Sequence, residues 1–285
     1  MFQLVNKYCI INNMENKERL LILFQPSAGI CNRLKCMFSV IKTHPYSTEF
    51  FIHWPTSHIV DATFNKLFHL QGYKINEVND CDFRRYINVS PPVSMQWRLN
   101  VDGEELPNGF TKAFPKEDTN LEYIDFEFHR IPLDIQRRYS SLIGHLRPSE
   151  DVQTRINSIH LPENTIGIHI RHNKAWEDAG RSNISLEEFF SCVDSHLTPY
   201  NKIFIATPSE YIYDAVSSYY GERVISLPDK DYSSSRDAVA ELFLLSKCKV
   251  LVGTFGSTFS EFSWYLSGCS QSVTIVGAYD RWNNG

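Results

Sequence analysis

The second half of the chain alternates short apolar runs with longer amphipathic segments, and this alternation constrains the fold more than any other feature. Strands are expected at 166–170, 202–206, 224–227, 249–253 and 272–276, with helices between them at 186–197, 209–219, 236–247 and 258–266. Strands that alternate with helices of this length form a doubly wound parallel sheet. Ligands of such sheets bind outside the carboxyl ends of the strands, so the loops at those ends are where a site is expected.

The first half begins with the same pattern. Strands are expected at 19–24, 49–54 and 73–78, with helices at 32–42 and 61–70 between them. Turn signals make residues 80–130 irregular apart from a strand near 122–128, and helices are expected next at 133–144 and 149–158. With 285 residues, the chain is long enough for two domains. We therefore expect an α/β fold with two domains, at 1–130 and 131–285.

Composition excludes several classes of protein. The net charge is −5, with 33 acidic and 28 basic residues, so the global basic face typical of nucleic-acid-binding proteins is not expected. The seven cysteines are scattered without a C-x-x-C pair, which favours reduced thiols and a cytoplasmic protein. No run approaches the ~20 apolar residues of a membrane span, and the first residues lack the apolar core of a signal peptide. The oligomeric state stays open.

The first candidate for chemistry is the turn after the first expected strand, where Gly29, Asn32 and Arg33 stand in the run Gly-Ile-Cys-Asn-Arg-Leu. A glycine lets the backbone approach a ligand closely, and the first turn of a helix offers free N–H groups to an anion. Asn32 can both donate and accept. The alternative interpretation is a turn glycine followed by a solvated helix charge.

The second candidate is His169 and Arg171, at the end of an apolar strand in the second half. A guanidinium fork suits a phosphate and stays charged at any working pH. When a glycosidic bond to a diphosphate breaks, negative charge grows on the diphosphate, and an arginine there stabilises the transition state more than the ground state. The alternatives are a structural ion pair for Arg171 and a core histidine for His169.

The third candidate is the run Gly-Thr-Phe-Gly-Ser-Thr that follows the strand expected at 249–253. Gly256, Ser257 and Thr258 form a small-residue turn before a helix, where hydroxyls and N–H groups can hold a phosphate. Glu241 lies on the preceding helix, where a buried carboxylate needs donors such as those of a nucleobase edge. Ordinary helix capping by Ser257 and a surface charge at Glu241 are the alternatives.

Other signatures are absent or weak. Asp229-Lys-Asp231 has the D-x-D form of a metal-binding motif, but it stands in a polar loop before a helix and is interpreted as an acidic loop. The sequence has no G-x-x-x-x-G-K-[ST], no G-x-S-x-G and no H-x-x-x-H. We therefore expect no metal and no cofactor.

The three candidate segments, taken in order, resemble the α1,6-/protein O-fucosyltransferase superfamily, which includes the nodulation fucosyltransferases. The resemblance runs from Gly29 to Leu266, is strongest from residue 166 onward, and includes the run Phe-Ile-Ala-Thr-Pro-Ser at 204–209. It implies a fold of the GT-B type, with two Rossmann-like domains facing a cleft. It also implies an inverting, metal-independent glycosyltransferase whose nucleotide-sugar donor binds the C-terminal domain.

The resemblance also assigns roles. Arg171 matches the arginine that contacts the donor β-phosphate and is needed for activity. The other matches are His169 beside the guanine, Glu241 for the aspartate that reads the base, Ser257 and Thr258 in the phosphate turn, and Asn32 facing the sugar and the diphosphate. The chain lacks the second arginine and the aspartate that follow Arg171 in the family, since His172, Asn173 and Lys174 stand there. The resemblance makes GDP-fucose the preferred donor, whereas these departures at the donor site keep another donor such as UDP-xylose as the alternative.

The remaining roles are less specified. An inverting mechanism uses a base on the acceptor hydroxyl or a strongly pulled leaving group. Asp61, after the strand expected at 49–54, is the candidate base, with capping of the next helix as the alternative. The acceptor is expected to be a glycan of unknown identity. A function of another class, an inactive nucleotide-sugar-binding regulator, is disfavoured because such a protein does not need Arg171.

Overall fold

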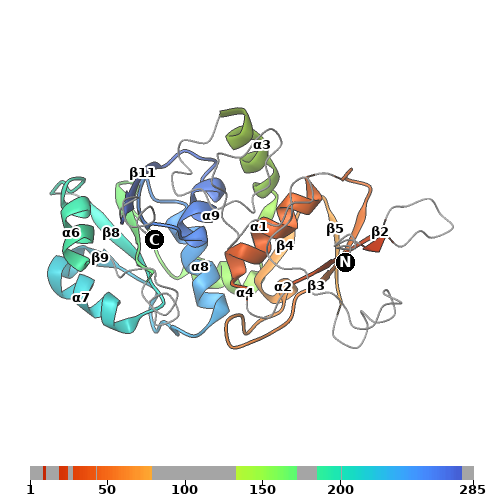
Figure 1. Cartoon of the computed structure of the whole chain (residues 1–285). Coiled ribbons are helices and arrows are strands. Elements are labelled where there is room, and N and C mark those ends of the chain that lie inside the picture. Colours follow the sequence, from red (N-terminus) through yellow and green to blue (C-terminus); the bar gives the residue numbers. More distant parts are fainter. Residues whose placement is uncertain are drawn as a thin grey trace, which may run out of the picture. The chain divides into compact units, whose positions relative to one another are not determined.

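The computed structural model describes residues 9–10, 19–24, 28–42, 44–78, 133–171, 185–199 and 201–277. The chain divides into two compact units (Figure 1), of which the first is Met1–Tyr123 with Ser141–Ser149 and the second is Ile124–Ser140 with Glu150–Gly285. The division falls within helix α3 (Leu133–Ile143). The boundary expected at residues 130 and 131 and the strand expected near 122–128 lie outside the described residues.

The first unit contains a sheet with strand order β1-β2-β3-β5. Its strands are β1 (Cys9–Ile10), β2 (Arg19–Leu23), β3 (Glu49–His53) and β5 (Lys74–Glu77). Strands β2, β3 and β5 are parallel, whereas β1 pairs with β2 in the antiparallel sense. Helix α1 (Ile30–Ile41) connects β2 to β3, so its first turn begins at the carboxyl edge of the sheet.

Helix α1 is buried on most of its surface, because apolar side chains lie all around it. Leu34, Met37 and Phe38 are fully buried, as are Phe50 and Ile52 of β3. The exceptional members of this core are two cationic side chains of α1, Arg33 and Lys35, which are almost completely buried. The first turns of α1 therefore hold charge inside the unit instead of presenting it to solvent.

The prediction of a helix at 61–70 is wrong for most of that range. A single turn, α2 (Phe64–Leu67), is followed directly by strand β4 (Phe68–Leu70), which pairs antiparallel with β6 (Leu146–Pro148). The carboxylate of Glu77 accepts hydrogen bonds from the N–H groups of Phe64 at 2.8 Å and Asn65 at 3.1 Å. The N-cap of α2 is Thr63, so the capping role that was the alternative for Asp61 does not occur.

The second unit contains a fully parallel sheet with strand order β11-β10-β7-β8-β9. Its strands are β7 (Thr165–His169), β8 (Lys202–Ala206), β9 (Val224–Ile225), β10 (Val250–Thr254) and β11 (Ser272–Val276), as the sequence predicts. The chain winds outward from β7 through β8 to β9, then returns to the other side of β7 as β10. The order therefore reverses between β7 and β10, which is where ligands of doubly wound sheets bind.

Helices cover both faces of this sheet (Figure 1). They are α4 (Glu150–Asn157), α6 (Leu186–Asp194), α7 (Glu210–Tyr220), α8 (Ser235–Leu245) and α9 (Thr258–Leu266), with a short 3₁₀ turn η4 (Gly221–Arg223) after α7. One face packs β-strand isoleucines against α6 and α7. On the other face, a Cβ on Gly167 would lie 2.6 Å from Leu245 of α8, and one on Gly253 would lie 2.8 Å from Ser260 of α9. Glycine thus lets α8 and α9 lie close to the sheet.

Candidate functional site

The carboxyl ends of β7 and β10 are joined by the hydroxyl of Thr254. Thr254 Oγ1 donates to the backbone oxygen of His169 at 2.8 Å and accepts from the backbone N–H of Arg171 at 2.9 Å. Because one hydroxyl bonds to both sides of Ile170, the chain leaves β7 in a defined direction. The predicted pair His169 and Arg171 is therefore fixed at the point where the strand order reverses.

The imidazole of His169 lies against the beginning of α9. Its Nδ1 is 2.8 Å from Ser260 Oγ and 3.5 Å from Ser257 Oγ, and its ring stacks on Phe259 with ring centroids 4.6 Å apart. The side chain is 4 % exposed. The structure thus brings His169 together with the small-residue turn, as expected for two parts of one site.

Burial keeps His169 uncharged. Burial, together with the nearby positive charges of Arg171 and Lys230, lowers the pKa of His169 to about 3. At neutral pH the imidazole is a neutral group with one donor and one acceptor nitrogen. It can orient a ligand by hydrogen bonding, but it does not supply charge.

The first turn of α9 differs from the starts of α6, α7 and α8. Ser185, Ser209 and Ser234 each accept a hydrogen bond from an N–H in the first turn of α6, α7 and α8, respectively. Ser257 stands at the same position of α9 but makes no such bond, and its hydroxyl lies near His169 instead. The capping by Ser257 that was the alternative interpretation is therefore absent in the structure.

The N–H groups at the start of α9 are consequently left for a ligand. Within the described part of the chain, no hydrogen bond uses the backbone N–H of Thr258, Phe259 or Ser260. The preceding Gly256 has φ +66°, a conformation that favours glycine. Free N–H groups at the positive end of a helix form a binding site for a phosphate or another anion.

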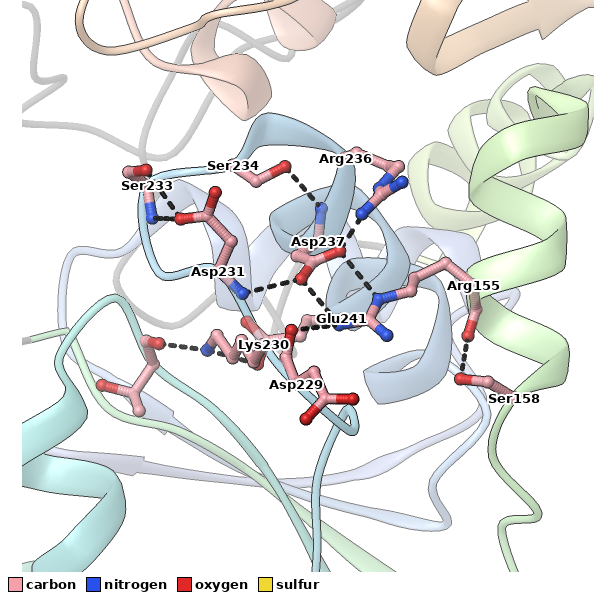
Figure 2. A network of polar contacts seen from close by, with 11 residues as sticks. Arg155, Ser158, Asp229, Lys230, Asp231, Ser233, Ser234, Arg236, Asp237 and Glu241 are labelled. Carbon is pink, nitrogen blue, oxygen red and sulfur yellow. Dashed lines mark hydrogen bonds and ion pairs between the residues drawn. The ribbon is translucent and has the colours of Figure 1, made fainter.

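Glu241 is buried on α8 and paired with a lysine that sequence reasoning missed. Lys230 Nζ lies 2.5 Å from Glu241 Oε1 and also donates to the backbone oxygen of Thr207, which directly follows β8 (Figure 2). Burial raises the pKa of Glu241 to about 7, against the opposing effect of the Lys230 charge. The alternative of a surface helix charge is therefore wrong, since Glu241 is 4 % exposed.

The loop that carries Lys230 is held by a second ion pair. Arg155 of α4 makes two hydrogen bonds of 2.8 Å to the carboxylate of Asp237 and a third to the backbone oxygen of Asp229. Asp237 also accepts from the backbone N–H of Asp231, whose own carboxylate accepts from the N–H and hydroxyl of Ser233 (Figure 2). The D-x-D segment thus has a structural role, because its backbone and carboxylates hold this loop.

In the first unit, Gly29 and Asn32 lie at the start of α1. Gly29 is the N-cap residue with φ −68°, and a Cβ added there would meet nothing within 4 Å. Neither conformation nor packing therefore requires glycine. Asn32 Oδ1 is buried and has no hydrogen-bond partner among the residues that the structure describes. An acceptor buried without a partner is costly, which makes Asn32 a candidate for contact with a ligand.

Arg33 lies inside the first unit rather than in solvent. Its Nε donates to the backbone oxygen of Ala28 and its Nη1 to that of Pro55, both at 2.8 Å. The guanidinium carbon lies 5.0 Å from the ring centroid of Trp54, and burial lowers the pKa of Arg33 to about 10. The alternative of a solvated helix charge is therefore wrong. Arg33 joins the segment before α1 to the segment after β3.

Two further groups were missed because their importance depends on tertiary contacts. Trp54 is 3 % exposed, and its indole Nε1 has no hydrogen-bond partner in the described part of the chain. Arg155 and Asp237 are 82 positions apart, so only the fold brings them together. Asp61, which the sequence did suggest as the base, is exposed on the loop after β3.

The described ranges contain neither a helix able to span a membrane nor a group of metal-ligating side chains. No helix there is both long and apolar enough to cross a lipid bilayer. In the same ranges, no three side chains of His, Cys, Asp or Glu are grouped as a metal ion would require.

The arrangement of strands and helices is that of fucosyltransferases of known structure. No protein-family model matches the sequence, and no curated protein matches it. Among solved structures, the chain resembles fucosyltransferase NodZ from Bradyrhizobium with a TM-score of 0.51 and 16% identity, covering 87% of this chain and 93% of NodZ. It also resembles POFUT1 in complex with GDP-fucose, with a TM-score of 0.53 and 13% identity, covering 90% of this chain and 98% of POFUT1.

At these identities the likeness concerns the fold. It confirms the α/β fold of the GT-B type and the structural resemblance to fucosyltransferases that the sequence predicts. A further structure with the same fold is POFUT1 in complex with GDP, with a TM-score of 0.52 and 14% identity.

Proposed function

We propose that this protein is a glycosyltransferase that moves a sugar from a nucleotide-sugar donor to a glycan acceptor. The single observation that carries the proposal is the uncapped first turn of α9 beside Arg171, at the reversal of strand order in the second unit. This edge offers backbone N–H groups, a helix dipole and a guanidinium, which together suit a diphosphate. Solved proteins with this fold bind GDP or GDP-fucose, which supports a nucleotide sugar as donor.

The chemistry follows from the charge that develops in the reaction. As the bond between the anomeric carbon and the diphosphate breaks, negative charge accumulates on the diphosphate oxygens. Arg171 and the N–H groups of Thr258 and Phe259 stabilise that charge, so they favour the transition state over the bound donor. These groups supply the positive charge that metal-dependent transferases take from a cation, which supports a metal-independent reaction.

The proposed reaction inverts the configuration of the anomeric carbon. The acceptor hydroxyl then attacks from the side opposite the diphosphate, while a base removes its proton. Asp61 is the proposed base because its exposed carboxylate follows β3 of the first unit. Gly29 and Asn32 are proposed to approach the sugar and diphosphate, and Arg33 to position them through Ala28 and Pro55.

The proposed donor is GDP-fucose, and the second candidate is another nucleotide sugar such as UDP-xylose. The first experiment is a thermal-shift panel of GDP, UDP, GDP-fucose, UDP-xylose, UDP-glucose and UDP-GlcNAc, without metal and then with Mn²⁺. A ligand at 100 times its dissociation constant stabilises a protein by ~2.7 kcal/mol, which is easily measured. A shift with UDP species alone would replace the fucose assignment, and no shift with any nucleotide would contradict the proposal.

The second experiment separates an enzyme from a binding protein. Replacing Arg171 with alanine is expected to lower turnover by roughly 10²–10³-fold, as for the loss of one group that stabilises transition-state charge. Arg223→Ala is the matched control, because Arg223 donates to the backbone oxygen of Thr198, near the amino edge of the same sheet. Normal transfer by the Arg171 variant would refute the assignment, and nucleotide binding without transfer by the natural protein would favour a regulator.

A further inference from the structure

Strands β7 and β10 separate at their carboxyl ends. Their ladder ends at the pair Ile168 and Val252. Two residues further on, Ile170 would lie opposite Thr254 if the ladder continued. There β10 still pairs with β11, and β7 still follows β8, because the N–H of Ile170 donates to the backbone oxygen of Ala206 at 3.1 Å. The sheet therefore opens between Ile170 and Thr254, at the point where the strand order reverses.

One hydroxyl replaces the backbone bonds that this separation removes. In a continued parallel ladder, the backbone of the residue opposite Ile170 would donate to the oxygen of His169 and accept from the N–H of Arg171. Thr254 Oγ1 makes both bonds instead, at 2.8 Å and 2.9 Å. The backbone oxygen of Thr254 accepts from the N–H of Ser257 at 3.2 Å, which closes the turn before α9. Thr254 thus holds β7 with its side chain and shapes this turn with its backbone.

Few side chains can replace the two backbone groups of a residue in this way. A hydroxyl is a donor and an acceptor on one atom, as the oxygen of His169 and the N–H of Arg171 together require. The branched Cβ of Thr254 restricts rotation about χ1, and the residue is 1 % exposed, so solvent does not supply these bonds. Buried polar groups that lose a partner are costly, so the two bonds determine how the chain continues after Ile170.

We propose that Thr254 is a positioning residue that sets Arg171 against the diphosphate of the donor, and that its hydroxyl is required for this task. The inference rests on the proposed function, since it concerns the arginine placed on the leaving diphosphate. Thr254 acts without touching the donor: it holds the backbone of Arg171 at a fixed distance from the turn that leads into α9. A misplacement of about 1 Å in such a site can cost ~100-fold in rate.

The test is a double-mutant cycle between Thr254 and Arg171. Thr254→Val removes the hydroxyl and keeps a similar shape, so we expect kcat to fall by about 10–100-fold while the donor KM changes less than about threefold. Thr254→Ser keeps the hydroxyl and should stay within about threefold of the natural protein. In an Arg171→Ala background, Thr254→Val should lower kcat by less than about threefold, because the group that it positions is gone.

Thr165→Val is the matched control. Thr165 stands at the amino end of the same strand and is also 1 % exposed, and its Oγ1 donates to the backbone oxygen of Pro162 at 2.6 Å. The control variant therefore loses a buried hydroxyl bond far from the carboxyl edge. It should be less stable in urea titration, as Thr254→Val should be, and it should keep kcat.

A purely structural role for Thr254 would give a different pattern. A loss of folded protein multiplies equally through both backgrounds, so equal losses of kcat with and without Arg171 would overturn the proposal. Thr254→Ser tests it even if the valine variant does not fold. A loss of more than about tenfold in Thr254→Ser would show that the hydroxyl is not sufficient, and this result would also overturn the proposal.

Nucleotide binding separates this inference from the function on which it rests. If the natural protein binds GDP or UDP but transfers no sugar, the proposed function fails, and the same cycle is measured by calorimetry. Thr254→Val should then weaken nucleotide binding in the natural background and leave it unchanged in Arg171→Ala, and equal weakening in both would refute the inference. If the natural protein binds neither nucleotide, the proposed function and the inference both fail.

Discussion

Arg155 holds Asp237 by two parallel hydrogen bonds, each 2.8 Å long, across 82 positions of the chain. Burial alone would raise the pKa of Asp237, but these bonds and the N–H of Asp231 outweigh burial and lower it. The carboxylate therefore stays charged although its side chain is completely buried. This ion pair anchors the loop that carries Lys230.

Removing one partner of this ion pair should be costly. In Arg155→Met, the buried carboxylate of Asp237 loses its two 2.8 Å hydrogen bonds and retains Arg236, whose Nε lies 3.5 Å away, and we expect the free energy of unfolding to fall by about 3–5 kcal/mol. Urea titration followed by circular dichroism measures the change. The double variant Arg155→Met with Asp237→Leu should recover much of the loss, because no charge is left unpaired. A loss of less than about 1 kcal/mol in the single variant would show that this ion pair stabilises the protein no more than an exposed pair does.

The pH dependence of stability should contain a contribution from His169. Its folded pKa is about 3, well below the unfolded value of about 6.5, so the unfolded chain binds one more proton between these values. The contribution is complete above about pH 6.5 and is lost as the pH falls, at about 1.4 kcal/mol per pH unit. In His169→Asn this loss is absent. The difference in unfolding free energy between the two proteins should therefore shrink from pH 7 to pH 4, and a constant difference would contradict the prediction.

Two glycine substitutions should affect different properties: Gly253→Ala should lower stability, whereas Gly29→Ala should weaken ligand binding. Gly253→Ala places a Cβ 2.8 Å from Ser260 Oγ, and we expect it to destabilise the protein by about 1–3 kcal/mol. Gly29→Ala meets no atom within 4 Å and keeps an ordinary φ, so stability should be unchanged or slightly higher. If Gly29 serves the approach of a ligand, its alanine variant should still bind nucleotide sugar more weakly. Denaturant titration and calorimetry together check both parts.

Trp54 should tolerate phenylalanine much better than alanine. Phenylalanine keeps most of the buried ring and removes an indole N–H that has no partner among the described residues, so the change in unfolding free energy should stay within about 1 kcal/mol. Trp54→Ala should cost about 3–5 kcal/mol, because it empties a packed site beside Phe24 and Phe64. Equal losses in the two variants would mean that the N–H has a partner in solution.

Much of the second unit could be predicted from the sequence because its signals are local. The central strands β7, β8 and β10 are apolar runs buried on both faces, and the helices between the strands have their own apolar spacing, so pattern alone indicates the alternation. The position of Arg171 at a strand end then follows from the topology of such sheets. The start of α9 was also predictable, since the run Gly-Ser-Thr after an apolar strand is visible without a structure.

The errors arose where a structure depends on distant partners. Residues 64–68 show helical spacing, but Phe68–Leu70 form a strand because they pair with Leu146–Pro148, about 80 positions away. Likewise, no local sequence pattern indicates that Lys230 pairs with Glu241, or that Arg33 is buried and donates to two backbone oxygens. In each case a loop or side chain takes its role from a segment that the fold brings near, and a single sequence does not encode that proximity as a pattern.

The missing cap of α9 has a consequence for the order of the molecule. Three neighbouring helices satisfy their first turns with their own serines, whereas the hydroxyl of Ser257 lies toward His169. Under the proposed function, an anion bound at the first turn of α9 acts as the missing cap. Binding at this site and ordering of this helix end are then thermodynamically linked, so the ligand also stabilises the local fold.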